Sequence, residues 1–165
     1  MLRSFAIQAL IFFVAFQGIS LLRETSMLST DVEITTITSQ ATRNVPTLMG
    51  ETIDLASQGK TTVIYFFAPW CQVCHVSIGN LQALYEKNEH IDVIAVVLDY
   101  TSIKEVINFT KRHQLTFPIA LGNEAIKHAF SISGYPSYYV IDAENIIMGK
   151  SMGYSSELGL FLRSL

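Results

Sequence analysis

The only two cysteines of the chain lie in one short stretch, Cys71-Gln72-Val73-Cys74, shortly after an apolar run. That run, Thr62 to Phe67, has the length and the aromatic and β-branched content of a fully buried strand. The cysteines are therefore expected where a strand ends and a helix begins. The apolar residues that continue from Cys74 at helical spacing are Ile78, Leu81 and Tyr85.

A place at the start of a helix gives the first cysteine a chemical role. The first helical turn offers free N–H groups and the positive end of the helix dipole, and both stabilise a thiolate. Cys71 is therefore expected to be the more acidic thiol and the nucleophile. Cys74 follows one turn later on the same side, close enough to form a disulfide with Cys71. The sequence thus predicts a pair that cycles between dithiol and disulfide.

Three other roles for a cysteine pair fit the sequence less well. A structural disulfide usually closes a longer loop, and a closed zinc site needs four ligands, for which no second Cys/His pair stands at metal spacing. Cys71-Gln72-Val73-Cys74-His75 also matches the C-x-x-C-H motif of haem attachment. A buried strand before the motif and alternating strands and helices after it favour redox chemistry. Haem attachment stays open as the alternative.

The N-terminus is predicted to be a membrane anchor. Residues 4–22 carry no charge and are mostly apolar, which is about the length that spans a bilayer as a helix. Arg3 precedes this run, so the positive-inside tendency places the N-terminus in the cytoplasm. Residues 1–23 are interpreted as a single-pass signal-anchor in the inner membrane, with the domain on the periplasmic or extracytoplasmic side. The alternative is a signal peptide cleaved before Leu21; both interpretations export the rest of the chain.

The remainder of the chain is predicted to be a linker followed by one α/β domain. Residues 24–43 are rich in Ser and Thr and lack a helical period, as a linker would. Residues 44–165 begin with a hairpin, alternate strands with helices, and end with a second hairpin and a helix, which indicates a mixed sheet. The predicted strands are 45–48, 52–55, 62–67, 91–98, 117–121, 137–141 and 146–151, and the predicted helices begin near Cys71, Ile103, Glu124 and Ser155.

This order of elements resembles the thioredoxin fold, in which a mixed central sheet is flanked by helices. The specific features are Trp70 before the Cys-x-x-Cys motif and a downstream Gly134-Tyr135-Pro136. The leading hairpin at Val45-Pro46 and the central helix-plus-strand insertion ending at Phe117-Pro118 are similar to the membrane-tethered branch typified by TlpA, ResA and DsbE proteins. The resemblance covers the chain from Asn44 to the C-terminus.

The resemblance implies roles for five residues. Cys71 would be the nucleophile and Cys74 the resolving cysteine, joined in a redox-active disulfide. Trp70 would shield the pair and form part of the substrate surface. Pro136 would be cis and face the disulfide, and Tyr135 would present its backbone to a substrate strand.

The chain departs from the pattern of the thioredoxin-like family at two positions. Tyr65 stands where many thioredoxins have a buried Asp, and Ser77 stands where many relatives in this branch have a Glu. Those carboxylates are thought to take the proton of the resolving cysteine. His75, four residues after Cys71, is a candidate modulator that stabilises the thiolate when protonated, with a solvated helix histidine as the alternative. No role is assigned to the remaining histidines, His90, His113 and His128.

The sequence therefore predicts an extracytoplasmic thiol–disulfide oxidoreductase that acts on protein substrates as a reductant. The reaction needs no metal or organic cofactor, and an exported reductant needs a membrane redox partner to recharge it. The alternative is a thioredoxin-like binding or chaperone module with regulatory cysteines. A peroxiredoxin function is disfavoured because no Thr-x-x-Cys motif precedes a helix. With a formal net charge of −3 and no basic stripe, nucleic acid is not an expected partner.

Overall fold

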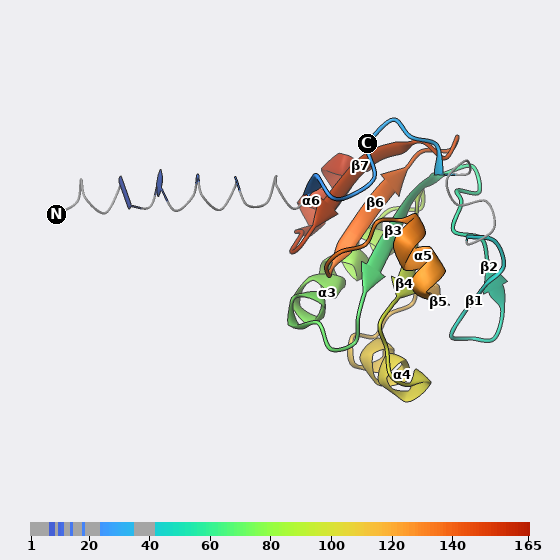
Figure 1. The fold of residues 1–165 in the computed structure, drawn as a ribbon. Helices are drawn as coiled ribbons and strands as arrows, with labels where there is room; N and C mark the ends of the chain where they lie inside the picture. The colour runs from blue at the N-terminus through green and yellow to red at the C-terminus, as the bar shows by residue number, and fades with distance from the viewer. Residues whose placement is uncertain (1–6, 9, 12–13, 15–17, 19–23, 35–41) are drawn as a thin grey trace.

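A five-stranded mixed sheet with helices on both faces forms the centre of the molecule (Figure 1). The structure, a computed structural model, describes residues 7–8, 10–11, 14, 18, 24–34 and 42–165. The strand order is β5-β4-β3-β6-β7; β3, β4 and β5 run parallel, and β6 and β7 are antiparallel to their neighbours. The strands are β3 (Thr61–Phe67), β4 (Ile91–Val97), β5 (Ile119–Leu121), β6 (Ser137–Ile141) and β7 (Ile147–Met152). The helices are α3 (Gln72–Lys87), α4 (Ile103–Arg112), α5 (Glu124–Ala129) and α6 (Glu157–Arg163).

The predicted N-terminal hairpin is present as a separate two-stranded sheet. Its strands, β1 (Val45–Pro46) and β2 (Thr52–Ile53), pair antiparallel around Met49-Gly50. Thr47, just after β1, forms an antiparallel bridge with Ala120 of β5, which attaches the hairpin to the edge of the main sheet. The mixed α/β architecture predicted from the sequence is confirmed.

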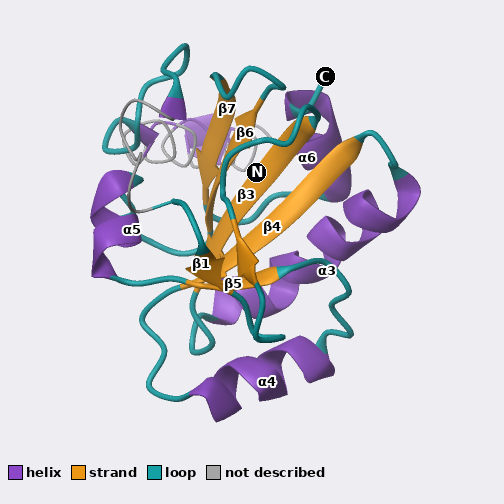
Figure 2. Cartoon of the chain, turned by 90° about the vertical axis from the view of Figure 1, so that its right-hand side faces the viewer, coloured by secondary structure: helices purple, strands orange, loops and turns teal. Residues whose placement is uncertain are grey.

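The alternation of side chains along β3 divides the core into two layers. Successive residues of a strand point to opposite faces, so Val63, Tyr65 and Phe67 lie on one face while Ile64 and Phe66 lie on the other. The first face is covered by α3, α4 and α6, and the second by α5 (Figure 2). All five side chains are buried, as the continuous apolar run predicted. The apolar residues of α3 that cover the first face are Ile78, Leu81 and Leu84.

The topology of the sheet brings three distant parts of the chain to one end of the sheet. β3 runs parallel to β4, so the residues after both strands, including Cys71 and Asp99, emerge at the same end of the sheet. β6 is antiparallel to β3 and its first residue, Ser137, pairs with Phe66 near the end of β3. Pro136, immediately before Ser137, therefore lies at that same end. The register of the sheet is what assembles the site.

The first half of the expected linker contacts the domain. Ile34 donates a backbone hydrogen bond to Asn145, and Ile147 donates one to Val32. Met27 and Ile34 are buried in the layer that includes α5. Residues 35–41 of the expected linker, and most of the expected anchor 1–23, lie outside the described residues. Within the described part of the chain, no helix has both the length and the apolar character needed to cross a membrane.

Candidate active site

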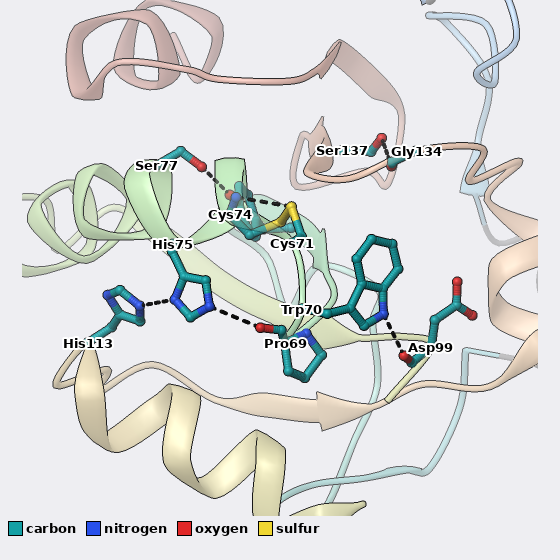
Figure 3. Close-up of a disulfide and its surroundings, with 11 residues drawn as sticks. Pro69, Trp70, Cys71, Cys74, His75, Ser77, Asp99, His113, Gly134 and Ser137 are labelled. Atoms are coloured by element: carbon teal, nitrogen blue, oxygen red, sulfur yellow. Dashed lines mark hydrogen bonds between the residues drawn. A yellow bond between two sulfur atoms is a disulfide. The ribbon is translucent and has the colours of Figure 1, made fainter. Parts of the chain in front are cut away.

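Cys71 and Cys74 form a disulfide at the junction of β3 and α3 (Figure 3). β3 ends at Phe67, a four-residue turn follows, and α3 begins at Gln72 with Cys71 as its N-cap. The two Cα atoms are 5.2 Å apart, as one helical turn requires. The predicted position of the pair, where a buried strand meets a helix, is confirmed.

The sulfur of Cys71 caps the helix. Its Sγ accepts a hydrogen bond of 3.1 Å from the backbone N–H of Cys74, an N–H group that has no partner within the helix. The first turn of α3 contains no acidic side chain that would compete for this role. Cys71 is 5% exposed and Cys74 is 0% exposed, so an incoming substrate reaches Cys71 first. A thiolate on Cys71 would have the same N–H donor and the helix dipole to stabilise it.

Trp70 lies beside the disulfide and is tied to Asp99. Its Nε1–H donates a 2.9 Å hydrogen bond to the backbone carbonyl of Asp99, although the indole is 59% exposed. The ring stands edge-on to Tyr135, with centroids 5.7 Å apart. An exposed aromatic side chain held by a hydrogen bond offers rigid apolar surface for contact with a partner.

The Asp99 carboxylate fixes the other half of this aromatic pair. Its Oδ2 accepts a 3.0 Å hydrogen bond from the Tyr135 hydroxyl, and Lys127 Nζ lies 2.7 Å from the same oxygen. Burial, and then the nearby Asp99 carboxylate, raise the pKa of Tyr135, so the phenol remains a neutral donor. The hydrogen bond to Asp99 also raises the pKa of Lys127. Asp99 thus holds Trp70 and Tyr135 together in one fixed pair.

Pro136 follows Tyr135 through a cis peptide bond, as the resemblance implied. It is buried, and Ser137 Oγ donates a 2.8 Å hydrogen bond back to the carbonyl of Gly134, which closes the turn. The turn lies at the end of the sheet where Cys71 lies. The fold therefore brings four residues to the same end of the sheet: Trp70, Cys71, Tyr135 and Pro136.

Two hydroxyls replace the carboxylates on the α3 face behind the disulfide. Tyr65 and Ser77 are almost fully buried, and their oxygens are 2.6 Å apart. Burial raises the pKa of Tyr65, and the hydrogen bond with Ser77 offsets this in part, so the phenol keeps its proton and is a poor base. None of the buried polar side chains in the described part of the chain is an Asp or a Glu. The buried Cys74 thus has hydroxyl groups on this face and no buried acid.

The His75 side chain contacts His113, a residue to which the sequence analysis assigned no role. Its Nε2 is 3.0 Å from the carbonyl oxygen of Pro69, and its Nδ1 is 2.7 Å from Nε2 of His113 (Figure 3). The two imidazoles and Phe109 form a cluster with ring centroids 4.6 to 5.0 Å apart. The sequence could have indicated this only through Phe109 and His113, which lie four residues apart at the end of α4.

An open groove of about 900 Å³ runs along α4 beside this cluster. Trp70 and His75 line one side, and the exposed face of α4 lines the other. The charged side chains that border it are Glu105, Lys111 and Arg112.

The fold and the disulfide together define a class, that of thioredoxin-fold proteins with a Cys-x-x-Cys pair at a helix N-terminus. More narrowly, the chain belongs to the AhpC/TSA family, whose family model matches residues 37–150. It is 30% identical over 116 residues to the thioredoxin-like protein YneN of Bacillus subtilis (strain 168), covering 67% of each chain. It is 31% identical over 99 residues to the thiol-disulfide oxidoreductase ResA of Oceanobacillus iheyensis, covering 56% of this chain and 51% of ResA.

A solved structure supports the same fold. StoA from Bacillus subtilis superposes with a TM-score of 0.66 at 22% identity, over 73% of this chain and 94% of StoA. The thioredoxin-like resemblance predicted from the sequence is confirmed. The family match does not supply a Thr-x-x-Cys motif, because the residue three positions before Cys71 is Ala68 and the residue three before Cys74 is Cys71.

Proposed function

We propose that this chain is an extracytoplasmic thiol–disulfide oxidoreductase that reduces disulfides of protein substrates. The observation that carries the proposal is the arrangement of Cys71, which caps α3 through its sulfur and is the more exposed member of the disulfide. Two of the relatives, ResA and the sporulation protein of Bacillus subtilis, are named thiol-disulfide oxidoreductases.

The reaction transfers two electrons to the substrate. In the reduced protein the Cys71 thiolate attacks one sulfur of a substrate disulfide; a mixed disulfide forms, and the first substrate thiolate leaves and takes a proton from solvent. Cys74 then loses its proton and attacks the Cys71 sulfur. The mixed disulfide breaks, the second substrate thiolate leaves, and the Cys71–Cys74 disulfide remains. The reverse sequence oxidises a dithiol.

Burial around the pair supports the reducing direction. Cys74 is fully buried against apolar residues and uncharged hydroxyls. In such surroundings the reduced form of Cys74 is a neutral thiol, so no second thiolate stabilises the dithiol form relative to the disulfide. A protein whose disulfide form is favoured is a reductant toward its partners, and a membrane redox partner would return it to the dithiol.

The direction can be measured with the full-length protein. We expect reduced protein to cleave insulin disulfides, and the Cys71/Cys74 couple to equilibrate with glutathione below about −220 mV, toward the value of about −270 mV found for thioredoxin. A potential near the roughly −120 mV of DsbA would reverse the proposed direction. Absence of exchange with insulin and with glutathione disulfide would favour the binding or chaperone module instead.

The substrate surface is proposed to be Trp70, Tyr135 and Pro136. An extended substrate segment beside the Tyr135-Pro136 turn would pair through main-chain hydrogen bonds, which tolerate varied side chains. The hydrogen bonds from Trp70 and Tyr135 to Asp99 support this role, because they hold both rings in place before a partner arrives.

Haem attachment through the same motif is less well supported. A haem attachment motif needs neither the buried strand before Cys71 nor the cis Pro136 at the same end of the sheet, and both are present here. The absorption spectrum of purified protein distinguishes the two, since a covalently bound haem gives a strong visible band and a disulfide gives none.

Residues 1–23 are proposed to anchor the domain of residues 44–165 in the inner membrane, with the domain outside the cytoplasm. The described apolar residues of this segment are in helical conformation, and Ile7, Leu10, Ile11 and Val14 are each about 60% exposed. Exposed apolar side chains along a helix suit a lipid environment.

Protease added to spheroplasts should therefore digest the domain, while high salt should not release it from membranes. A soluble mature form that begins near Leu21 would replace the anchor by a cleaved signal peptide. Protection of the domain from protease in intact spheroplasts would contradict export.

A further inference from the structure

Two histidines from different helices meet beside the turn that presents Cys71. His75 lies in the first turns of α3, and His113 caps the C-terminus of α4, where its backbone N–H donates to Phe109. The ring nitrogens His75 Nδ1 and His113 Nε2 are 2.7 Å apart, and the second nitrogen of His75 is 3.0 Å from the Pro69 carbonyl (Figure 3). Both nitrogens of His75 are thus occupied.

The partners determine which nitrogens carry protons. A carbonyl oxygen only accepts, so Nε2 of His75 carries a hydrogen and donates it to Pro69. In neutral His75 the other nitrogen, Nδ1, then has a lone pair and accepts from the Nε2–H of His113. One hydrogen therefore lies between the two rings.

This arrangement accepts one more proton but not two. With one added proton, either ring holds the charge and a single hydrogen still lies between His75 Nδ1 and His113 Nε2. With two added protons, both nitrogens would carry hydrogens facing each other across 2.7 Å, and the contact would break. The geometry of this contact therefore lets the two rings together hold one added proton.

Burial and neighbouring charges both act on His113. Burial, and then the charges of His75 and Arg112, lower the pKa of His113. The C-terminal end of the α4 dipole favours a cation at the same place. Glu105 and Lys111 of α4 border the groove next to His75, and α3 contributes no acidic residue in its first turn.

The Pro69 carbonyl links this pair to the nucleophile. Pro69 belongs to the four-residue turn 68–71, which is closed by a 3.1 Å hydrogen bond from the Cys71 N–H to the Ala68 carbonyl. His75 also donates its backbone N–H to the carbonyl of Cys71. His75 therefore holds the turn at both ends, and His113 holds the ring of His75.

We propose that His75 and His113 form a positioning pair for disulfide exchange, which fixes the turn carrying Cys71 and, by taking one proton, places a positive charge one helical turn from that cysteine. The inference rests on the proposed function, because Cys71 is its target. The neutral pair orients the turn. The protonated pair also stabilises the Cys71 thiolate, so Cys71 stays reactive at lower pH than the helix N-terminus alone would allow.

Two His113 variants separate the two effects. His113→Gln keeps an N–H donor for His75 Nδ1 but does not titrate, whereas His113→Leu removes both. In reduced full-length protein, the rate of Cys71 alkylation by iodoacetamide should show two steps against pH in the wild type. The lower step should move toward lower pH in His113→Leu, where His75 alone is left to take the proton and its Nδ1–H has no acceptor. Insulin reduction at pH 8 should be near the wild-type rate in His113→Gln and slower by about tenfold in His113→Leu, because the turn is less well fixed.

The control is His128→Gln, which changes an exposed histidine on α5 and should leave both measurements unchanged. Superposable alkylation profiles for wild type and His113→Leu would overturn the proposal. So would imidazole ¹⁵N spectra of the wild type in which His75 and His113 both become fully cationic in independent steps. The alkylation and ¹⁵N measurements need no disulfide substrate. They therefore test the histidine pair independently of insulin reduction, which tests the proposed function.

Discussion

Cys71→Ser should abolish disulfide exchange, whereas Cys74→Ser should complete the first attack and stop there. A serine hydroxyl is not ionised near neutral pH and is a poor nucleophile toward sulfur, so insulin reduction by Cys71→Ser should fall by about three orders of magnitude or more. Cys74→Ser retains the reactive Cys71 thiolate but has no second sulfur to release the partner. It should therefore accumulate mixed disulfides, visible as bands on non-reducing gels that dithiothreitol removes.

The roles of the two cysteines have an independent check. In the reduced wild type at mildly acidic pH, an alkylating agent should label Cys71 before Cys74, because Cys71 is the more exposed and caps the helix. Preferential labelling of Cys74, or mixed disulfides formed by Cys71→Ser in place of Cys74→Ser, would exchange the two roles.

The Cys74→Ser trap also tests the aromatic surface. Adding Tyr135→Thr removes the ring that packs edge-on against Trp70 and the hydrogen bond to Asp99. The set of trapped proteins should change, while the rate with the small substrate glutathione disulfide should stay within about twofold, since a small disulfide needs little of that surface. Tyr135→Phe is the matched control, because it keeps the ring and loses only the hydroxyl. An unchanged set of trapped proteins would remove Tyr135 from the substrate surface.

The sequence predicted those features that depend on local patterns. The run from Thr62 to Phe67 is apolar at every position except its first, so it had to be a strand buried on both faces, and β3 is such a strand. A helix had to follow because Ile78 and Leu81 repeat at helical spacing. Once strand and helix were placed, Cys71 could only lie at the helix start. The chemistry of the cysteine pair followed from that position.

Contacts between distant segments were not predictable in the same way. Asp99 lies between β4 and α4 and does not cap α4, whose N-cap is Ser102. Asp99 instead adopts a left-handed backbone conformation, with φ of 48°, and its oxygens bind Trp70, Tyr135 and Lys127. No periodicity connects these positions, since the sheet register alone brings them together. The same holds for His113, which is 38 residues from His75.

The sequence showed that Tyr65 and Ser77 stand where related proteins have carboxylates. It did not show that the two hydroxyls contact each other. Tyr65 points to the α3 face because it alternates with Ile64 and Phe66, and Ser77 points to the sheet because it lies one turn after Cys74. The 2.6 Å contact between the two hydroxyls shows that each substitution is accommodated by the other. A buried polar atom without a partner would destabilise the fold, so the two positions are expected to depend on each other.

This dependence leads to a gain-of-function prediction for Ser77→Glu. A carboxylate at this buried position is one helical turn from Cys74 and can accept the hydrogen bond of the Tyr65 hydroxyl. Burial would raise the pKa of the new carboxyl group toward neutrality, where a general base is most effective. Release of the mixed disulfide, the step that needs deprotonated Cys74, should accelerate by about a hundredfold at pH 7, within the range typical of general-base catalysis.

The prediction is measured in single turnover and has a matched control. A mixed disulfide is formed between Cys71 and a chromophoric thiol, and the release of that thiol by Cys74 is followed at several pH values. Ser77→Gln has nearly the volume of Ser77→Glu but cannot take a proton, so it should release the thiol at close to the wild-type rate. Both variants should lose about 1–3 kcal/mol of stability through crowding of a packed site and imperfect pairing of the new polar group, and thermal melts check that each remains folded.

Equal release rates for Glu and Gln in folded protein would mean that the proton of Cys74 leaves by a route independent of position 77. Acceleration by Glu alone would mean that the Tyr65–Ser77 hydroxyl pair limits the resolving step in the natural chain, and that this protein is built to hold its partner in the mixed disulfide longer than a relative with the carboxylate does.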